Sequence, residues 1–199
     1  MKKIVYVIPG HDEFYDKQKG YKVIGKLFEE QDFQVYPIKI NWKVKDNNFD
    51  NYIQQFNKQA NRHSKKDQVV ILGYSFGAMI ALKASASIKP NLLILCSLSP
   101  YYVENYSSMR PSWLSWWKKH FSNEYSFHAQ IKPIKFPVYF VFGALEDISI
   151  KKLARLGRSS LEKSRLFIAS EAKHNLHSKF YLSKLGKIIN KLPFDLSPK

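Results

Sequence analysis

Apolar runs of strand length recur along the chain and alternate with amphipathic stretches of helical spacing. Within each run the apolar residues are nearly continuous, which is typical of strands that are buried on both faces of a parallel sheet. The runs lie at Ile4–Ile8, Phe33–Ile38, Gln68–Leu72, Leu92–Cys96, Val138–Phe142 and Arg165–Ala169. The alternation of strand and helix predicts an α/β protein, with a three-layer, doubly wound, mostly parallel sheet.

The stretches beside these runs carry apolar residues on one helical face. The clearest stripes are Tyr21, Ile24, Leu27 and Phe28, then Phe49, Tyr52, Ile53 and Phe56, and finally Tyr181, Leu185, Ile188, Ile189 and Leu192. The last stripe stops at Pro193, which cannot continue a helix. The 199 residues contain no internal repeat and no low-complexity linker, so we expect a single domain, residues 1–199.

One segment interrupts the alternation. Residues 99–136 form a connection far longer than the usual ~4–6 residues, which indicates an insertion. Pro111 is well placed to begin a short helix inside it. One face of that helix would carry Trp113, Trp116, Trp117 and His120. This face either packs onto the core or forms a cap over an active site, where the three tryptophans would bind substrate.

Ser75 lies where a predicted buried strand meets a predicted helix, in the sequence Gly73-Tyr74-Ser75-Phe76-Gly77. A serine in a tight turn between strand and helix adopts strained backbone angles, and only small residues fit two positions before and after it. The turn would present the Ser75 hydroxyl as a nucleophile at the carboxyl edge of the sheet, where ligands bind in open parallel sheets. The Phe76 N–H, at the positive end of the helix, would bind a developing oxyanion.

This G-x-S-x-G pattern in its strand-to-helix context resembles the α/β-hydrolase superfamily, in a minimal, six-stranded form. The resemblance implies that an acid and then a histidine follow Ser75 in the chain. We expect Asp147 to be the acid, with Glu146 as the alternative. We expect His174 to be the base, with His177 as its competitor. The loop after the first strand would supply a second oxyanion donor, the backbone N–H of His11.

Composition limits the remaining choices. The formal net charge is +16, but the 32 basic residues include only five arginines and are spread along the whole chain. We therefore expect no specific nucleic-acid partner and at most a weak association with anionic surfaces. The single Cys96 excludes an internal disulfide, and the apolar run Ile4–Ile8 is too short for a signal peptide, so we expect a cytoplasmic protein. No metal motif or nucleotide-binding glycine motif occurs, and we expect no cofactor.

Together these features predict a serine hydrolase that cleaves a small-molecule carboxylic ester or thioester through an acyl-enzyme. Aromatic residues in the insertion favour an apolar acyl group, and the basic surface would suit an anionic leaving group. Two alternatives remain open at this level. One is a non-catalytic binding protein with the same fold, and the other is a basic, aromatic-rich protein that associates peripherally with membranes.

Overall fold

A single parallel sheet organises the structure, a computed structural model that describes residues 1–43, 48–60, 63–109, 111–121 and 125–193. The described strands follow the order β2-β1-β3-β4-β5-β6. They are β1 (Lys3–Ile8), β2 (Phe33–Pro37), β3 (Gln68–Tyr74), β4 (Leu92–Cys96), β5 (Val138–Gly143) and β6 (Ser164–Ala169). All the predicted strands are confirmed, with ends that differ by at most two residues.

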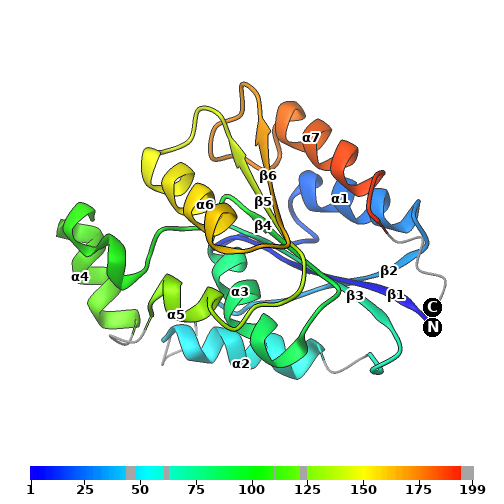
Figure 1. Cartoon of the computed structure of the whole chain (residues 1–199), viewed down its shortest axis with the longest axis horizontal. Coiled ribbons are helices and arrows are strands. Elements are labelled where there is room, and N and C mark those ends of the chain that lie inside the picture. Colours follow the sequence, from blue (N-terminus) through cyan, green and yellow to red (C-terminus); the bar gives the residue numbers. More distant parts are fainter. Residues whose placement is uncertain (44–47, 61–62, 110, 122–124, 194–199) are drawn as a thin grey trace.

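Helices cover both faces of this sheet (Figure 1). One face carries α1 (Lys19–Glu29) and α7 (Lys179–Ile189), which pack against each other. The other face carries α2 (Phe49–Ala60), α3 (Phe76–Ile88) and α6 (Ile148–Ser160). The three-layer, doubly wound architecture predicted from the alternating pattern is confirmed.

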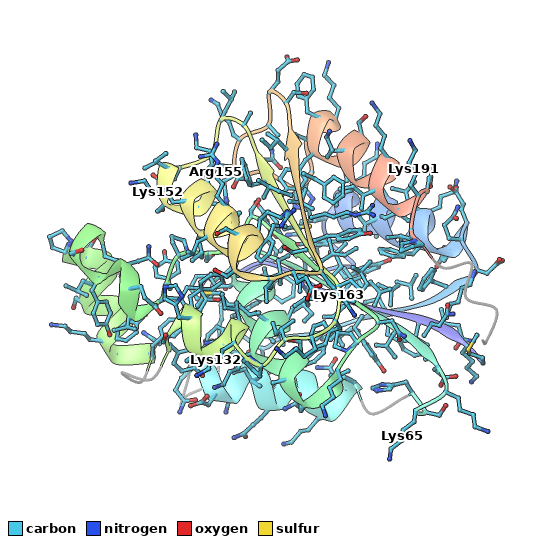
Figure 2. All side chains as sticks on the ribbon, in the orientation of Figure 1. Lys65, Lys132, Lys152, Arg155, Lys163 and Lys191 are labelled. Atoms are coloured by element: carbon cyan, nitrogen blue, oxygen red, sulfur yellow. The ribbon has the colours of Figure 1, made fainter. Side chains whose placement is uncertain are left out.

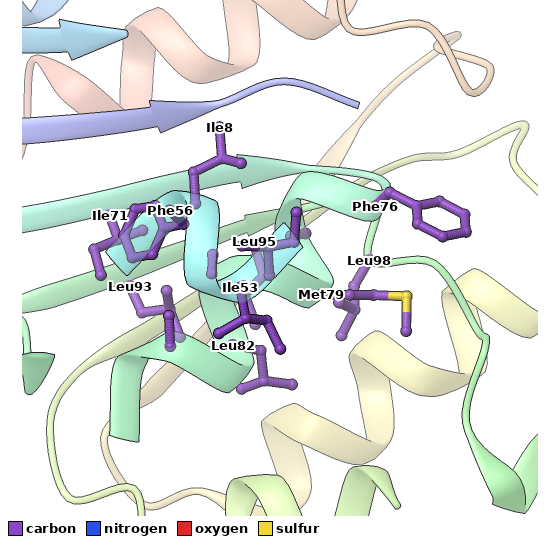
Figure 3. Close-up of a cluster of buried hydrophobic side chains, with 14 of the residues drawn as sticks. Ile8, Ile53, Phe56, Ile71, Phe76, Met79, Leu82, Leu93, Leu95 and Leu98 are labelled. Atoms are coloured by element: carbon purple, nitrogen blue, oxygen red, sulfur yellow. The ribbon is translucent and has the colours of Figure 1, made fainter. Parts of the chain in front are cut away.

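The pleat of the strands divides the core into two apolar clusters. Successive side chains of a strand point to opposite faces, so Ile4 and Tyr6 of β1 face α2 and α3, whereas Val5 and Val7 face α1 and α7. Figure 3 shows part of the first cluster. There the labelled residues Ile8, Ile71, Leu93 and Leu95 of the sheet pack with Ile53 and Phe56 of α2 and with Met79 and Leu82 of α3. Burial on both faces explains why the sequences of the inner strands β1, β3, β4 and β5 are continuously apolar.

The predicted insertion lies between β4 and β5. It contains the 3₁₀ helix η1 (Val103–Ser108), α4 (Pro111–His120) and α5 (Phe127–Ile131), and the helix expected to begin at Pro111 is confirmed. Tyr102 and Phe127 are fully buried and stack edge to face, and α5 packs against α3. The insertion is therefore anchored in the core, while α4 lies at one end of the molecule (Figure 1).

Basic side chains are distributed over several separate elements. The labelled examples in Figure 2 are Lys65, Lys132, Lys152, Arg155, Lys163 and Lys191, which are spread across the view. Across the described ranges, no helix combines the length and the apolar character needed to cross a bilayer.

Candidate active site

Ser75 occupies a strained turn between β3 and α3. Its φ and ψ are 55° and −116°, a combination that non-glycine residues rarely adopt. The flanking glycines are required sterically. A Cβ on Gly73 would lie 2.3 Å from the Gly77 carbonyl oxygen, and a Cβ on Gly77 would lie 2.3 Å from that of Ile8. The Ser75 N–H donates to the Cys96 carbonyl at 2.9 Å, so the turn is also tied to β4.

His174 reaches Ser75 from the segment between β6 and α7. Its Nε2 lies 3.1 Å from the Ser75 Oγ, which is hydrogen-bonding distance. The imidazole also lies against the ring of Tyr74, with centroids 5.2 Å apart. The Ser75 Oγ has a second hydrogen-bond partner, the Oγ of buried Ser99, at 3.0 Å. The structure thus brings together the serine and the histidine that the sequence selected.

The acid nearest to this histidine is Glu146. Its Oε2 lies 3.8 Å from the His174 Nδ1, and its side chain is completely buried. Its other oxygen, Oε1, accepts a hydrogen bond of 2.5 Å from the Ser97 hydroxyl. In the described part of the chain Oε2 has no hydrogen-bond partner. The unpaired oxygen is therefore the one that faces the imidazole.

Asp147, the acid favoured by the sequence, has a different structural position. It caps the N-terminus of α6, where its Oδ1 accepts hydrogen bonds from the Ser149 N–H at 2.8 Å and the Ser149 hydroxyl at 2.6 Å. Its side chain also lines the cavity beside Ser75. The geometry favours Glu146 over Asp147, because the 147 side chain is engaged by the helix terminus whereas the 146 side chain turns inward beneath His174.

Backbone contacts fix the segments that carry Glu146 and His174 against each other. The Leu145 N–H donates to the Ala172 carbonyl at 2.9 Å. The approach is so close that a Cβ on Gly143 would lie 2.3 Å from the same carbonyl oxygen. The Glu146 N–H donates to the Gly143 carbonyl at 3.1 Å, which closes a turn at the end of β5. The spacing of the acid and the histidine is therefore set by the main chain.

A small polar network lies beneath Glu146 and was not predicted from the sequence. The Ser97 Oγ lies 2.7 Å from the Tyr181 hydroxyl, which donates to the Val141 carbonyl at 3.0 Å. Ser97 has a φ of 48°, a strained value that directs this serine at the end of β4 into the interior. Burial raises the pKa of the Tyr181 phenol well above its usual range, and nearby Cys96 and Glu146 reinforce the shift. Tyr181 therefore stays protonated and available as a donor.

A cavity of about 760 Å³ opens beside Ser75. It is lined mainly by apolar surface, from His11, Ser75, Phe76, Ser99, Pro100, Tyr101, Ser112, Asp147, Ser149, Ile150 and His174. The Phe76 ring packs against Tyr101 and His11, with centroids 5.0 and 5.4 Å away. Ser112 belongs to α4, so the insertion contributes one wall. Neither lysine nor arginine occurs among the described residues of the lining.

The expected oxyanion donors both border this cavity. Phe76 is the first residue of α3, and His11 follows β1 in the loop beside it. The His11 ring packs against Trp42 as well as Phe76, with centroids 5.1 Å apart in the Trp42 pair. Burial lowers the pKa of the His11 imidazole, although Asp12 at 3.6 Å acts in the opposite direction.

The tryptophans expected to bind substrate divide into two groups. Trp117 is fully buried, its Nε1 donates to the Tyr101 carbonyl at 2.9 Å, and its ring stacks on Phe121. Trp117 is absent from the described lining of the cavity, so its position agrees with packing onto the core. The side chains of Trp113 and Trp116 lie outside the described part of the structure.

Among the described side chains, no group of three or more His, Cys, Asp or Glu residues is placed to hold a metal ion. The side chains around Ser75 instead suit proton transfer and nucleophilic attack.

Comparison with known proteins identifies the fold. No protein-family model matches the sequence, and no curated protein matches it. Solved structures do match. Est1E from Butyrivibrio proteoclasticus, in a structure with bound ferulic acid, has a TM-score of 0.76 and 10% identity, over 94% of this chain and 86% of that chain.

Two further matches have the same architecture. Mouse alpha/beta hydrolase domain-containing protein 10 has a TM-score of 0.73 and 11% identity, over 95% of this chain and 88% of the other. The thioesterase domain from the curacin biosynthetic pathway has a TM-score of 0.68 and 14% identity, over 95% and 91% of the two chains. With six described strands in one parallel sheet, the chain has a minimal α/β-hydrolase fold.

Proposed function

We propose that this protein is a serine hydrolase that cleaves a carboxylic ester or thioester through an acyl-enzyme intermediate. The observation that carries the proposal is the 3.1 Å separation of the His174 Nε2 and the Ser75 Oγ in a strained turn beside a large apolar cavity. A serine hydroxyl is a weak nucleophile until a neighbouring base accepts its proton. The esterases and the thioesterase domain among the structural matches support the same class of reaction.

In the proposed reaction the Ser75 oxygen attacks the acyl carbon while His174 accepts the hydroxyl proton. Collapse of the tetrahedral intermediate breaks the bond to the leaving group, which takes that proton from the imidazolium. Water then enters, loses a proton to His174 and attacks the acyl-enzyme. Collapse of the second intermediate returns the proton to Ser75 and releases the carboxylic acid.

Glu146 replaces Asp147 as the orienting carboxylate in this proposal. A buried carboxylate at the Nδ1 of the base fixes the tautomer that leaves Nε2 free to accept the serine proton, and it stabilises the imidazolium. The observed distance of 3.8 Å is longer than a hydrogen bond. Such contacts are often long without substrate and shorten in the reacting complex.

The oxyanion would bind between the backbone N–H groups of Phe76 and His11. The first belongs to the positive end of α3, which favours developing negative charge. A positioned donor of this kind contributes about 3–4 kcal/mol to the stability of the transition state. His177 takes no part in this scheme, because its Nε2 faces Glu13 at 3.4 Å.

The cavity favours a substrate with a neutral, apolar acyl group. Phe76, Tyr101 and Ile150 provide apolar walls, and each covered methylene contributes about 0.8 kcal/mol. The anionic leaving group suggested by the basic composition has no lysine or arginine to meet it among the described lining residues. We therefore propose an uncharged ester or thioester of a medium-length or aromatic acid.

Hydrolysis of p-nitrophenyl butyrate tests the proposal. The Ser75→Ala and His174→Ala variants should each lose at least about 10³-fold in kcat, because the members of such a unit act together. Ser85→Ala is the matched control, since Ser85 is a buried serine of α3 whose hydroxyl donates to the Leu82 carbonyl of its own helix. Full activity in Ser75→Ala would refute the proposed function.

A further inference from the structure

Gly10, immediately before the proposed oxyanion donor, is held at both of its backbone polar groups. Its N–H donates to the Tyr21 hydroxyl at 2.9 Å. Its carbonyl accepts a hydrogen bond of 3.1 Å from the Glu13 N–H. The Tyr21 hydroxyl in turn donates to the Glu13 carboxylate. Glu13 therefore acts on Gly10 twice, directly through its main chain and indirectly through Tyr21.

These bonds set the direction of the His11 N–H. The peptide between Gly10 and His11 is trans, so its N–H points away from its carbonyl oxygen. Because Glu13 holds the Gly10 carbonyl oxygen on one side of this peptide, the His11 N–H points to the opposite side of the peptide. The fit is tight, because a Cβ on Gly10 would lie 2.9 Å from the Glu13 Oε2.

Tyr21 is suited to link these two groups. Its side chain is buried between α1 and the sheet, in the same cluster as Tyr74. Burial raises the pKa of its phenol far above the usual range, and the charge of Glu13 adds to the effect. The hydroxyl therefore keeps its proton, which it gives to the carboxylate, while its lone pair accepts the Gly10 N–H.

The other carboxylate oxygen of Glu13 faces the segment that carries the proposed base. The His177 Nε2 lies 3.4 Å from the Glu13 Oε1, and the His177 ring packs edge to face on Tyr21, 5.2 Å between centroids. The ring also lies directly over α1, since a Cβ on Gly20 would be 2.2 Å from its Nδ1. His177 follows His174 by three residues, so Glu13 lies beside the segment that carries the proposed base.

We propose that Glu13 and Tyr21 are positioning residues that aim the His11 N–H at the oxyanion. This inference rests on the proposed function. The oxyanion forms only after Ser75 attacks the acyl carbon. A misdirected donor therefore stabilises the transition state less and leaves substrate binding unchanged. Loss of the Tyr21 hydroxyl should therefore lower kcat and leave KM nearly constant.

The test compares Tyr21→Phe with Tyr15→Phe in the hydrolysis of p-nitrophenyl butyrate. Tyr15 stacks on Tyr21, but its hydroxyl lies against Gly25 rather than Gly10, so it is a matched control. Tyr21→Phe should lower kcat roughly 10- to 100-fold, with less than a twofold change in KM. This decrease in kcat is smaller than the one expected when a whole oxyanion donor is removed. A kcat equal to that of Tyr15→Phe would overturn the inference.

Two Glu13 variants test the same positioning role without altering Tyr21, and they serve if Tyr21→Phe fails to fold. Glu13→Gln retains an oxygen that accepts from Tyr21, whereas Glu13→Ala removes it. We expect Glu13→Ala to lose kcat as Tyr21→Phe does and Glu13→Gln to retain most of it; equal, undiminished kcat in both overturns the inference. Hydrolysis that persists in Ser75→Ala refutes the proposed function instead. Ser75-dependent hydrolysis with unchanged kcat in the Glu13 variants refutes only the positioning role.

Discussion

The buried carboxylate of Glu146 faces the imidazole of His174, with 3.8 Å between Oε2 and Nδ1. The same imidazole places Nε2 3.1 Å from the Ser75 hydroxyl. The two nitrogens of one ring thus face an acid and a nucleophile, which is the order that proton transfer from the serine requires. A shift of less than about 1 Å would bring the carboxylate into hydrogen-bonding range.

The first prediction separates the adjacent acids. Glu146→Gln should lower kcat/KM for p-nitrophenyl butyrate by about 10³- to 10⁴-fold, because the base loses the carboxylate that fixes its tautomer. Asp147→Asn should cost less than about tenfold, since asparagine also caps a helix N-terminus well. The reverse ranking would return the role to Asp147.

The second prediction concerns the support of Glu146. Ser97→Ala removes the hydroxyl that donates to the Glu146 Oε1, so both Tm and kcat should fall, with about 1.5–3 kcal/mol lost from the free energy of unfolding. Ser97→Gly is the control for backbone strain, because glycine adopts the φ of 48° without penalty. Equal losses of kcat in the two variants identify the hydroxyl as the cause. Recovery of kcat in Ser97→Gly would identify backbone strain instead.

The third prediction tests the turn around Ser75. Gly77→Ala should destabilise the protein by about 1–3 kcal/mol or more, because the new Cβ meets main-chain oxygens that cannot move independently. Gly186→Ala in α7 is the matched control, since its Cβ would meet only the Leu27 methyl groups, at 3.7 and 3.8 Å. Urea unfolding should show a gain of about 0.5–1 kcal/mol for that variant. A Gly77→Ala variant as stable as the unsubstituted protein would contradict the steric account.

The fourth prediction tests the acyl wall. Tyr101→Ala should flatten the increase of kcat/KM along a series of p-nitrophenyl esters from acetate to octanoate, because the wall no longer covers the added methylenes, each worth about 0.8 kcal/mol. Turnover of the acetate should change little. Tyr106→Ala is the control, since Tyr106 belongs to the same insertion and packs on Trp117. If kcat/KM of Tyr101→Ala still rises with chain length as in the unsubstituted protein, the acyl group binds elsewhere.

The inner strands were predictable because parallel strands that are buried on both faces require continuous apolar sequence. Leu92–Cys96 is fully buried, and its ends were predicted without error. The turn at Ser75 was also predictable: the requirement for Gly73 comes from main-chain atoms a few residues away, and although Gly77 lies against the distant Ile8 carbonyl, the G-x-S-x-G pattern itself is local. Such local constraints leave direct traces in the sequence.

The orientation of the acid was not predictable in the same way. Glu146 and Asp147 are adjacent, and the turn that carries them is held by the Leu145–Ala172 hydrogen bond between segments far apart in the chain. A local signal existed, however: Asp147 followed by Ile148 and Ser149 is typical of a helix N-cap. That pattern already assigns the Asp147 carboxylate to the helix terminus.

Long-range contacts also explain why other features of the site were not predicted from the sequence. Ser97 and Tyr181 lie 84 residues apart, and only the folded sheet brings them to Glu146. Trp117 shares a helical face with Trp113, and the sequence could not decide whether that face meets a cavity or the core. The burial of Trp117 against Phe121 decides the question for that residue alone.

Covalent labelling with a fluorophosphonate is the most direct test of the central claim, that Ser75 is a nucleophile activated by His174. Mass spectrometry of the intact protein and of its peptides should show one phosphonyl group, located on Ser75. His174→Ala should react at least about 10³-fold more slowly, and Ser75→Ala should not be labelled. A label on another residue, or equal labelling of Ser75→Ala, would contradict the account.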